Sequence, residues 1–183
     1  TRKTIDYLLE FISLDYNICI THGNGPQVGN ELLRMDLTND KVPPLPLGIC
    51  VANTQGQIGY MVQQTLQNKL REIDVDREVV TLVTQVLVDE NDPSITNPTK
   101  YIGPRYSKSD IDEFVSKFRW EIKEQEPGSW RRVVPSPMPE YIMHGKSIKA
   151  LVDRGTIVVS SGGGGIPVFN NTSGQLEGLD AVI

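Results

Sequence analysis

A glycine-rich stretch that directly follows a short apolar run is the feature that most constrains the fold of this chain. The sequence Thr-His-Gly-Asn-Gly-Pro-Gln-Val-Gly occupies residues 21–29, after the apolar run of residues 17–20. Gly23 and Gly25 can adopt backbone angles that other residues avoid, and Pro26 has the fixed φ expected at the first position of a helix. The stretch therefore predicts a strand that turns sharply into a helix. Its backbone N–H groups can face an anion there, although an ordinary tight turn needs glycine for the same reason.

Helical patterns alternate with short β-rich runs along the chain, which is typical of an α/β domain with a mostly parallel sheet. Apolar residues at helical spacing predict helices over residues 5–12, 28–35 and 51–71. The last of these is long and amphipathic, with basic residues in its final turn. A further helix is predicted through residues 142–151.

The strongest strand signal is the β-branched run at residues 79–88, which predicts a central strand buried on both faces. Residues 156–160 predict a second strand, and residues 168–176 predict a hairpin with an Asn-Asn-Thr-Ser-Gly turn. The segment from about residue 92 to residue 138 is rich in charged residues, contains both tryptophans and is interrupted by several prolines. This segment predicts a small subdomain that projects from the main sheet.

A second glycine-rich loop, at residues 162–165, directly follows the strand predicted at residues 156–160. Ligands of open α/β sheets bind at the carboxyl ends of the strands, so the two loops would share one edge if their strands are parallel neighbours. Together the loops predict an anion site. Neither loop is a Walker A motif or a dinucleotide-binding fingerprint, and the alternative for the second loop is a flexible turn.

Few charged or metal-ligating residues have the spacing of a catalytic motif. Lys100 lies in a proline-rich loop that would hold it stiffly, so it can reach a bound anion, but a lone lysine is more often a solvated surface charge. With His22 and His144 as the only histidines and no Cys-x-x-Cys motif, we expect no metal-binding residues. A triad hydrolase lacks support because there is no Gly-x-Ser-x-Gly motif. Asp89, Glu90 and Asp92 can be acids, bases or magnesium ligands, or simply part of a charged loop.

The composition of the chain limits the classes of partner that it can bind. The net charge of −5 argues against an extended nucleic-acid surface, and no apolar run is long enough to span a bilayer. We therefore expect no nucleic-acid or membrane partner and a cytoplasmic location. The two cysteines, Cys19 and Cys50, lie in or beside apolar runs, so we expect reduced thiols that are buried as small hydrophobic residues rather than a disulfide.

Several of these motifs occur in series in a way that resembles the carbamate kinase family. They are His22-Gly-Asn-Gly-Pro-Gln-Val-Gly29, Gln55-Gly-x-Ile-Gly-Tyr60, Thr84-Gln-Val-x-Val-Asp89, Asn97-Pro-Thr-Lys100, Arg132-Val-Val-Pro-Ser-Pro137 and Gly162-Gly-Gly-Gly-Ile-Pro167. The resemblance implies the amino-acid-kinase fold, an α/β three-layer α/β/α sandwich. Residues 1–183 would then be its N-terminal, substrate-binding lobe with the projecting subdomain.

The resemblance also implies a function. Carbamate kinases reversibly convert carbamoyl phosphate and ADP into ATP and carbamate with Mg²⁺, in the arginine deiminase pathway, and a homodimer is expected. Gly23, Asn24 and Gly25 would hold carbamoyl phosphate, and Lys100 would be the substrate-side catalytic lysine. The second loop, formed by Gly162, Gly163, Gly164 and Gly165, would lie near the transferring phosphoryl group and the nucleotide. Phosphoryl transfer needs positioning and charge neutralisation, so no protein nucleophile is required.

Some features depart from the family pattern. Family members begin with an additional apolar strand and a Gly-Gly-Asn loop, and they continue past residue 183 into a nucleotide-binding lobe. We therefore expect a truncated chain that is inactive alone. The family's proline after the Asn-Pro-Thr-Lys lysine is Tyr101 here, and residues 124–130 also differ. A sibling kinase of the same fold and a non-catalytic anion-binding or dimerising module are the alternative hypotheses.

Overall fold

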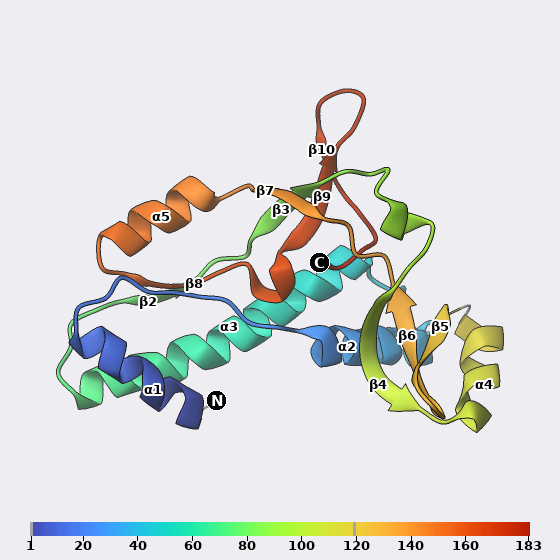
Figure 1. The fold of residues 1–183 in the computed structure, drawn as a ribbon, viewed down its shortest axis with the longest axis horizontal. Helices are drawn as coiled ribbons and strands as arrows, with labels where there is room; N and C mark the ends of the chain where they lie inside the picture. Colours follow the sequence, from blue (N-terminus) through green and yellow to red (C-terminus); the bar gives the residue numbers. More distant parts are fainter. Residues whose placement is uncertain (1, 119) are drawn as a thin grey trace.

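The computed structural model describes residues 2–118 and 120–183, which form helices and short strands in alternation (Figure 1). The helices are α1 (Arg2–Ser13), α2 (Gly25–Thr38), α3 (Leu47–Glu72), α4 (Lys108–Phe118) and α5 (Gly145–Asp153), with the 3₁₀ turns η1 (Pro93–Ile95) and η2 (Gly162–Gly164). The strands are β1 (Cys19–Ile20), β2 (Val79–Thr81), β3 (Gln85–Val88), β4 (Lys100–Tyr106), β5 (Ile122–Glu126), β6 (Ser129–Val134), β7 (Pro139–Ile142), β8 (Ile157–Val159), β9 (Ile166–Asn170) and β10 (Leu176–Gly178).

The first sheet is parallel, has the order β1-β8-β2 and lies between helices. Ile157 and Val159 of β8 pack with apolar residues of α1 and α3, including the fully buried Leu66 and Leu70. Successive side chains of a strand point to opposite faces, so Val158 points to the other face, where α5 contacts β8. Figure 1 shows this layering, with α5 on one side of β8 and β2 and with α3 and α1 on the other. The expected α/β class with helices on both faces is confirmed.

The second sheet continues two strands of the first after a break. Its order is β10-β9-β3-β7, with β3 and β9 parallel and the outer pairs antiparallel. The single central strand predicted at residues 79–88 is therefore wrong, because residues 82–84 interrupt it and divide it between two sheets. The β2 part is an edge strand, and only β3 is central. At the break, the amide of Thr84 donates to the side chain of Gln55 instead of to a neighbouring strand, and the carbonyl oxygen of Thr84 accepts from both Gln55 and the amide of Ile166.

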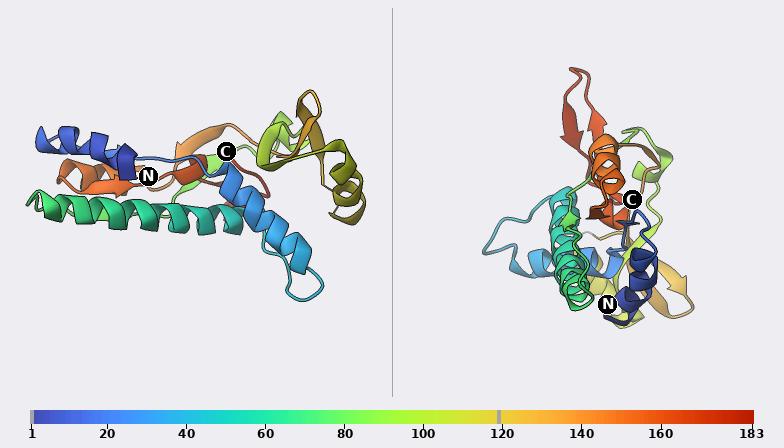
Figure 2. Two further views of the ribbon diagram at one scale, coloured as in Figure 1. Left: turned by 90° about the horizontal axis from the view of Figure 1, so that it is seen from below. Right: turned by 90° about the vertical axis from the view of Figure 1, so that its left-hand side faces the viewer.

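A third sheet, β4-β6-β5, is antiparallel and lies with α4 at one end of the long axis of the molecule (Figure 2). Tyr106, Phe114 and Trp120 pack their rings together between this sheet and α4, with Phe114 and Trp120 stacked at a centroid distance of 4.9 Å. This separate sheet lies in the segment for which we predicted a projecting subdomain. The division of the chain into a lobe and a subdomain stays a prediction.

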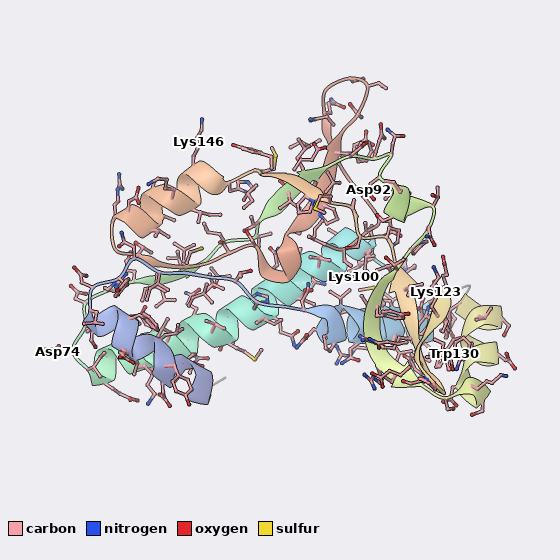
Figure 3. All side chains as sticks on the ribbon, viewed as in Figure 1. Asp74, Asp92, Lys100, Lys123, Trp130 and Lys146 are labelled. Atoms are coloured by element: carbon pink, nitrogen blue, oxygen red, sulfur yellow. The ribbon has the colours of Figure 1, made fainter. Side chains whose placement is uncertain are left out.

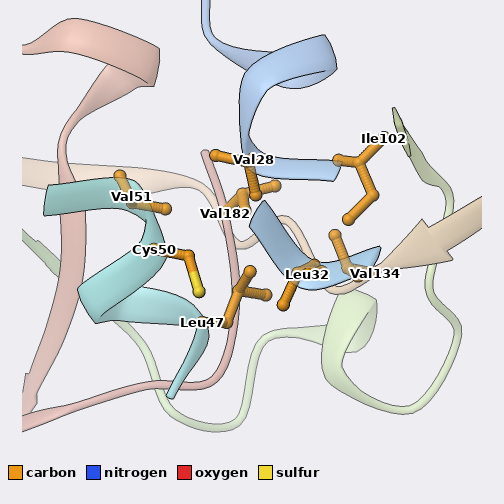
Figure 4. Packing of buried hydrophobic residues seen from close by; sticks show 8 residues of the cluster. All are labelled: Val28, Leu32, Leu47, Cys50, Val51, Ile102, Val134 and Val182. Atoms are coloured by element: carbon orange, nitrogen blue, oxygen red, sulfur yellow. The ribbon is translucent and has the colours of Figure 1, made fainter. Parts of the chain in front are cut away.

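Helix α2 joins the third sheet to the rest of the molecule. Gly29 of α2 lies directly against Gly103 of β4, so closely that a Cβ atom added to Gly29 would lie 1.9 Å from the Gly103 Cα. Next to this contact, α2, α3 and β4 enclose an apolar cluster that also includes residues of β6 and the end of the chain (Figure 4). Its members are Val28, Leu32, Leu47, Cys50, Val51, Ile102, Val134 and Val182. The cluster fixes α2, and with it the glycine-rich stretch at its start, relative to β4.

The predicted helices and turns agree with the structure apart from their ends. Helix α3 begins at Leu47, four residues earlier than predicted, with Pro46 at its N-cap position and the amide of Leu47 bonded to the carboxylate of Asp180. Ile142 belongs to β7, not to the helix predicted through it, which begins at Gly145. The predicted hairpin is confirmed by the antiparallel pairing of β9 with β10. Among the described residues, no helix is long and apolar enough to cross a membrane.

Candidate functional site

The two glycine-rich loops lie side by side because the strands before them are parallel neighbours. Cys19 and Ile20 of β1 pair with Val158 and Val159 of β8. Beyond this pairing, the amide of Gly163 donates a hydrogen bond of 2.7 Å to the carbonyl oxygen of His22. The predicted placement of the two loops at one sheet edge is therefore confirmed. The second loop also lies at the break between the first and second sheets, where its backbone groups do not pair with a neighbouring strand.

The second loop is shaped so tightly that glycine is required within it. Gly163 has a φ of +63°, and a Cβ atom there would lie 2.3 Å from the side-chain amide of Asn24. A Cβ atom on Gly162 would lie 2.3 Å from Nε2 of His22. Contacts this short are not found for real Cβ atoms, so the glycines allow the two loops to approach each other. The alternative of a flexible turn with excess glycine does not fit this packing.

The first loop presents backbone N–H groups at the start of α2. Helix α2 begins at Gly25 with Pro26 in its first turn, as predicted. Asn24 precedes it, but its side chain makes no cap and instead donates to Oγ1 of Thr54 at 2.9 Å. Within residues 2–118 and 120–183, the amides of Gly23 and Asn24 donate no hydrogen bond. Unpaired amides at a helix N-terminus attract anions.

Lys100 lies at the first position of β4, across from this loop (Figure 3). It pairs with Val134 of β6, and its side chain is exposed. Among the described residues its ammonium group makes no ion pair. The preceding loop is held by Lys123, whose Nζ donates to the carbonyl oxygen of Pro98 at 2.6 Å and to Oδ1 of Asn97 at 3.1 Å.

These elements enclose a cavity of about 260 Å³. It is lined by His22, Gly23, Asn24, Gly25, Val28, Lys100, Ile102, Gly163, Gly164, Val182 and Ile183. A larger cavity of about 990 Å³ lies elsewhere, between the start of α3 and β6, and neither glycine-rich loop lines it. The smaller cavity is the better candidate site, because it combines unpaired amides, a free cation and enclosure.

The structure brings together most of the residues that the sequence singled out. Gly23, Asn24, Gly25, Lys100, Gly163 and Gly164 all line the cavity. Gly162 and Gly165 of the second loop do not line it, because Gly162 packs against His22 and Gly165 against Val86. The roles assigned to these residues stay predictions.

Two residues of α3 support the loops, and the sequence assigned neither of them a role, although Gln55 begins one of the family motifs. Thr54 and Gln55 of α3 are buried and hydrogen-bond to the first and second loop, respectively. Their signal is present in the sequence: Gln55 follows Val51 by four residues, so a polar side chain occupies the apolar stripe of the helix. A buried polar residue needs hydrogen-bond partners, which the loops supply.

The residues of the cavity do not form a magnesium site. Among the described residues, its lining carries no carboxylate side chain, and no cluster of three or more histidine, cysteine, aspartate or glutamate residues suits a metal ion. Asp89 and Glu90 line a different cavity, together with Glu140. The carboxylate of Asp92 accepts hydrogen bonds from the amides of Ser94 and Met138, which points to a structural role.

Comparisons with known proteins agree on one family name. The chain is 46% identical over 184 residues to the carbamate kinase of Pyrococcus furiosus and 45% identical to the carbamate kinase-like protein YahI of Escherichia coli. Both matches cover the whole chain and 58% of the relative. Models of protein families give no match.

Solved structures give the same result. The carbamate kinase of Giardia lamblia bound to citric acid superposes on the whole chain with a TM-score of 0.94 at 36% identity, over 58% of that protein. The same enzyme bound to AMP-PNP superposes with a TM-score of 0.84. The resemblance to carbamate kinases is therefore confirmed along the whole of this chain, which spans 58% of the length of these relatives.

Proposed function

We propose that this chain, similar to carbamate kinases along its whole length, holds carbamoyl phosphate during reversible phosphoryl transfer to ADP, which yields ATP and carbamate. The observation that carries the proposal is the cavity in which both glycine-rich loops and Lys100 meet. Its unpaired amides and its cation suit a small phosphorylated anion, and its lining includes no acidic side chain to repel one.

The chemistry required of these residues is positioning and charge neutralisation. Amides of Gly23 and Asn24 can donate to phosphate oxygens, and the ammonium of Lys100 can offset the charge that spreads over the transferring group. No nucleophile is needed, which agrees with a lining that carries no serine or cysteine. The lining residues do not fit the magnesium ion that the family implies, so no step is assigned to it here.

The nucleotide partner is proposed from a relative. The carbamate kinase of Giardia lamblia has been solved with AMP-PNP, an ATP analogue, and superposes on this chain. We propose ATP and ADP as the nucleotides, with the second loop nearest to the transferring group. A homodimer, a cytoplasmic location and a place in arginine breakdown are further parts of the proposal that follow from the family resemblance.

The test is to measure whether the protein that contains this chain forms ATP from ADP and carbamoyl phosphate. Replacing Lys100 with alanine is expected to lower kcat/KM about 100-fold or more, since a cation is lost where charge develops. Lys146→Ala is the matched control, because Lys146 is an exposed lysine on α5, far from the cavity (Figure 3). No ATP formation by the wild type would contradict the function, and equal rates for both variants would remove Lys100 from the mechanism.

A further inference from the structure

Two adjacent buried side chains of α3 connect the helix to both glycine-rich loops. Thr54 has no exposed surface and Gln55 is 1% exposed. Thr54 accepts a hydrogen bond from the side chain of Asn24, in the first loop, and donates one of 2.7 Å to the carbonyl oxygen of Val51. Gln55 donates a hydrogen bond of 2.9 Å to the carbonyl oxygen of Gly162, in the second loop. One turn of helix thus contacts both sides of the cavity.

Gln55 also holds the break between the two sheets. Its Oε1 accepts from the amide of Thr84 at 2.9 Å, and its Nε2 donates to the carbonyl oxygen of Thr84 at 3.2 Å. The hydroxyl of Thr84 in turn accepts from the amide of Ser161, which has a left-handed φ of +51°. The side chain of Gln55 is therefore the partner of the Thr84 amide, and it adds a second donor to the Thr84 carbonyl oxygen, which also accepts from the amide of Ile166 at the start of β9. Through these bonds it fixes where the second loop begins.

We propose that Thr54 and Gln55 are positioning residues that set the separation of the two glycine-rich loops and thereby the anion affinity of the cavity. They act through the loops, because neither lines the cavity. Loops that are held in the binding geometry before the ligand arrives lose less conformational entropy on binding. The effect on anion affinity rests on the proposed function, whereas the effect on loop geometry does not.

The chain supplies a matched control for Gln55. Gln67 lies on the same helix, twelve residues later, and bridges to a neighbouring strand in the same way. Its Nε2 donates to the carbonyl oxygen of Arg77 at 3.2 Å, and its Oε1 accepts from the amide of Val79 at 3.1 Å. Gln67 contacts neither loop through these bonds. Gln55→Met and Gln67→Met therefore remove similar backbone bridges from α3, and only the first one touches the site.

The experiment compares amide hydrogen exchange and inorganic phosphate binding in the 183-residue chain and its variants. In Gln55→Met, the amides of Gly163 and Gly164 are expected to exchange about tenfold faster than in Gln67→Met, after correction for global stability. Phosphate binding, measured by calorimetry, is expected to weaken roughly tenfold in Gln55→Met alone. If Gln55→Met does not fold, Gln55→Asn keeps the amide group but shortens the side chain by one methylene, which withdraws the donor from Gly162.

A conservative pair tests the first loop. Thr54→Val removes the hydroxyl and is expected to weaken phosphate binding, whereas Thr54→Ser keeps the hydroxyl and is expected to restore it. Thr65→Val is the control, since Thr65 donates to a backbone carbonyl of α3 far from the loops. Equal exchange at Gly163 and Gly164 in the two glutamine variants would overturn the inference. A wild-type chain that binds neither phosphate nor carbamoyl phosphate would count against the proposed function, and loop exchange would still decide the geometry.

Discussion

Gly163 combines a φ of +63° with direct contact to Asn24, so a methyl group there would both strain the backbone and clash with the Asn24 side chain. Gly163→Ala is expected to destabilise the chain by about 2–4 kcal/mol, through backbone strain and the displaced Asn24 side chain. Gly174→Ala is the control, because Gly174 has a φ of +78° but open space where its Cβ would lie. That variant is expected to lose only about 1 kcal/mol. Urea unfolding measures both values.

The difference between the two variants isolates the contact between the loops. Equal losses would mean that the loops do not touch at Gly163 and that only the turn conformation matters. In either case the result concerns stability and is independent of any ligand.

Single side chains also explain why one cysteine is inert. Cys50 is fully buried in the apolar cluster, and this burial, with a smaller contribution from Glu31, raises the pKa of its thiol to about 11. The thiolate is therefore absent at neutral pH, as expected for a cysteine that acts as a small hydrophobic residue. Cys19 is exposed, contrary to the expectation for its apolar run, because β1 is an edge strand.

At the scale of elements, the crossing of α2 and β4 decides how the first loop lies relative to Lys100. Gly29→Ala places a Cβ atom 1.9 Å from the Gly103 Cα, so the helix and the strand must move apart. A loss of about 3 kcal/mol or more is expected, with weaker anion binding as the loop at the start of α2 shifts. Thermal unfolding and phosphate titration measure the two effects.

Gly56→Ala is the control for this substitution. Gly56 lies in the interior of α3 with open space where its Cβ would lie, so alanine is expected to stabilise the chain by up to about 1 kcal/mol. If Gly29→Ala did not destabilise the chain, the close packing of α2 on β4 would be wrong.

The elements were largely predictable because their signals are local. Periodicity identified α3, and the glycine and proline pattern identified the start of α2. The break between β2 and β3 was not predictable from residues 79–88, since it depends on Gln55, 29 residues before Thr84 in the chain. The glycine-rich loops and Lys100 could be singled out from the sequence, but their supports Thr54 and Gln55 required knowledge of which helix packs below them.

At the scale of the whole molecule, Asp92 links the two segments that connect the third sheet to the rest. Its carboxylate accepts from the amide of Met138 at 3.0 Å and from that of Ser94 at 2.8 Å. These hydrogen bonds, that of Met138 most of all, hold the pKa of Asp92 below its ordinary value. The charged carboxylate thus contributes stability above the pKa of the unfolded chain, about 4, and this contribution is lost as pH falls through the lower folded value.

The stability difference between the wild type and Asp92→Asn is therefore expected to be largest near neutral pH and to shrink steadily below about pH 4. Unfolding by urea at a series of pH values measures it. Asp40→Asn, a change of an exposed aspartate in the turn after α2, controls for the loss of a surface charge. A difference that does not vary with pH would show that the carboxylate of Asp92 does not make these bonds.

The most direct test of the proposed site is a titration of the ¹⁵N-labelled chain with carbamoyl phosphate, in which the amide chemical shifts are followed. Saturable shifts are expected at five residues that line the cavity, Gly23, Asn24, Gly25, Gly163 and Gly164. No shifts are expected at Gly128 or Gly174, which lie in distant turns. In Lys100→Ala the same shifts are expected at roughly tenfold or higher ligand concentration. Shifts that spread over the surface without saturation, or that spare both glycine-rich loops, would contradict the claim that this cavity binds carbamoyl phosphate.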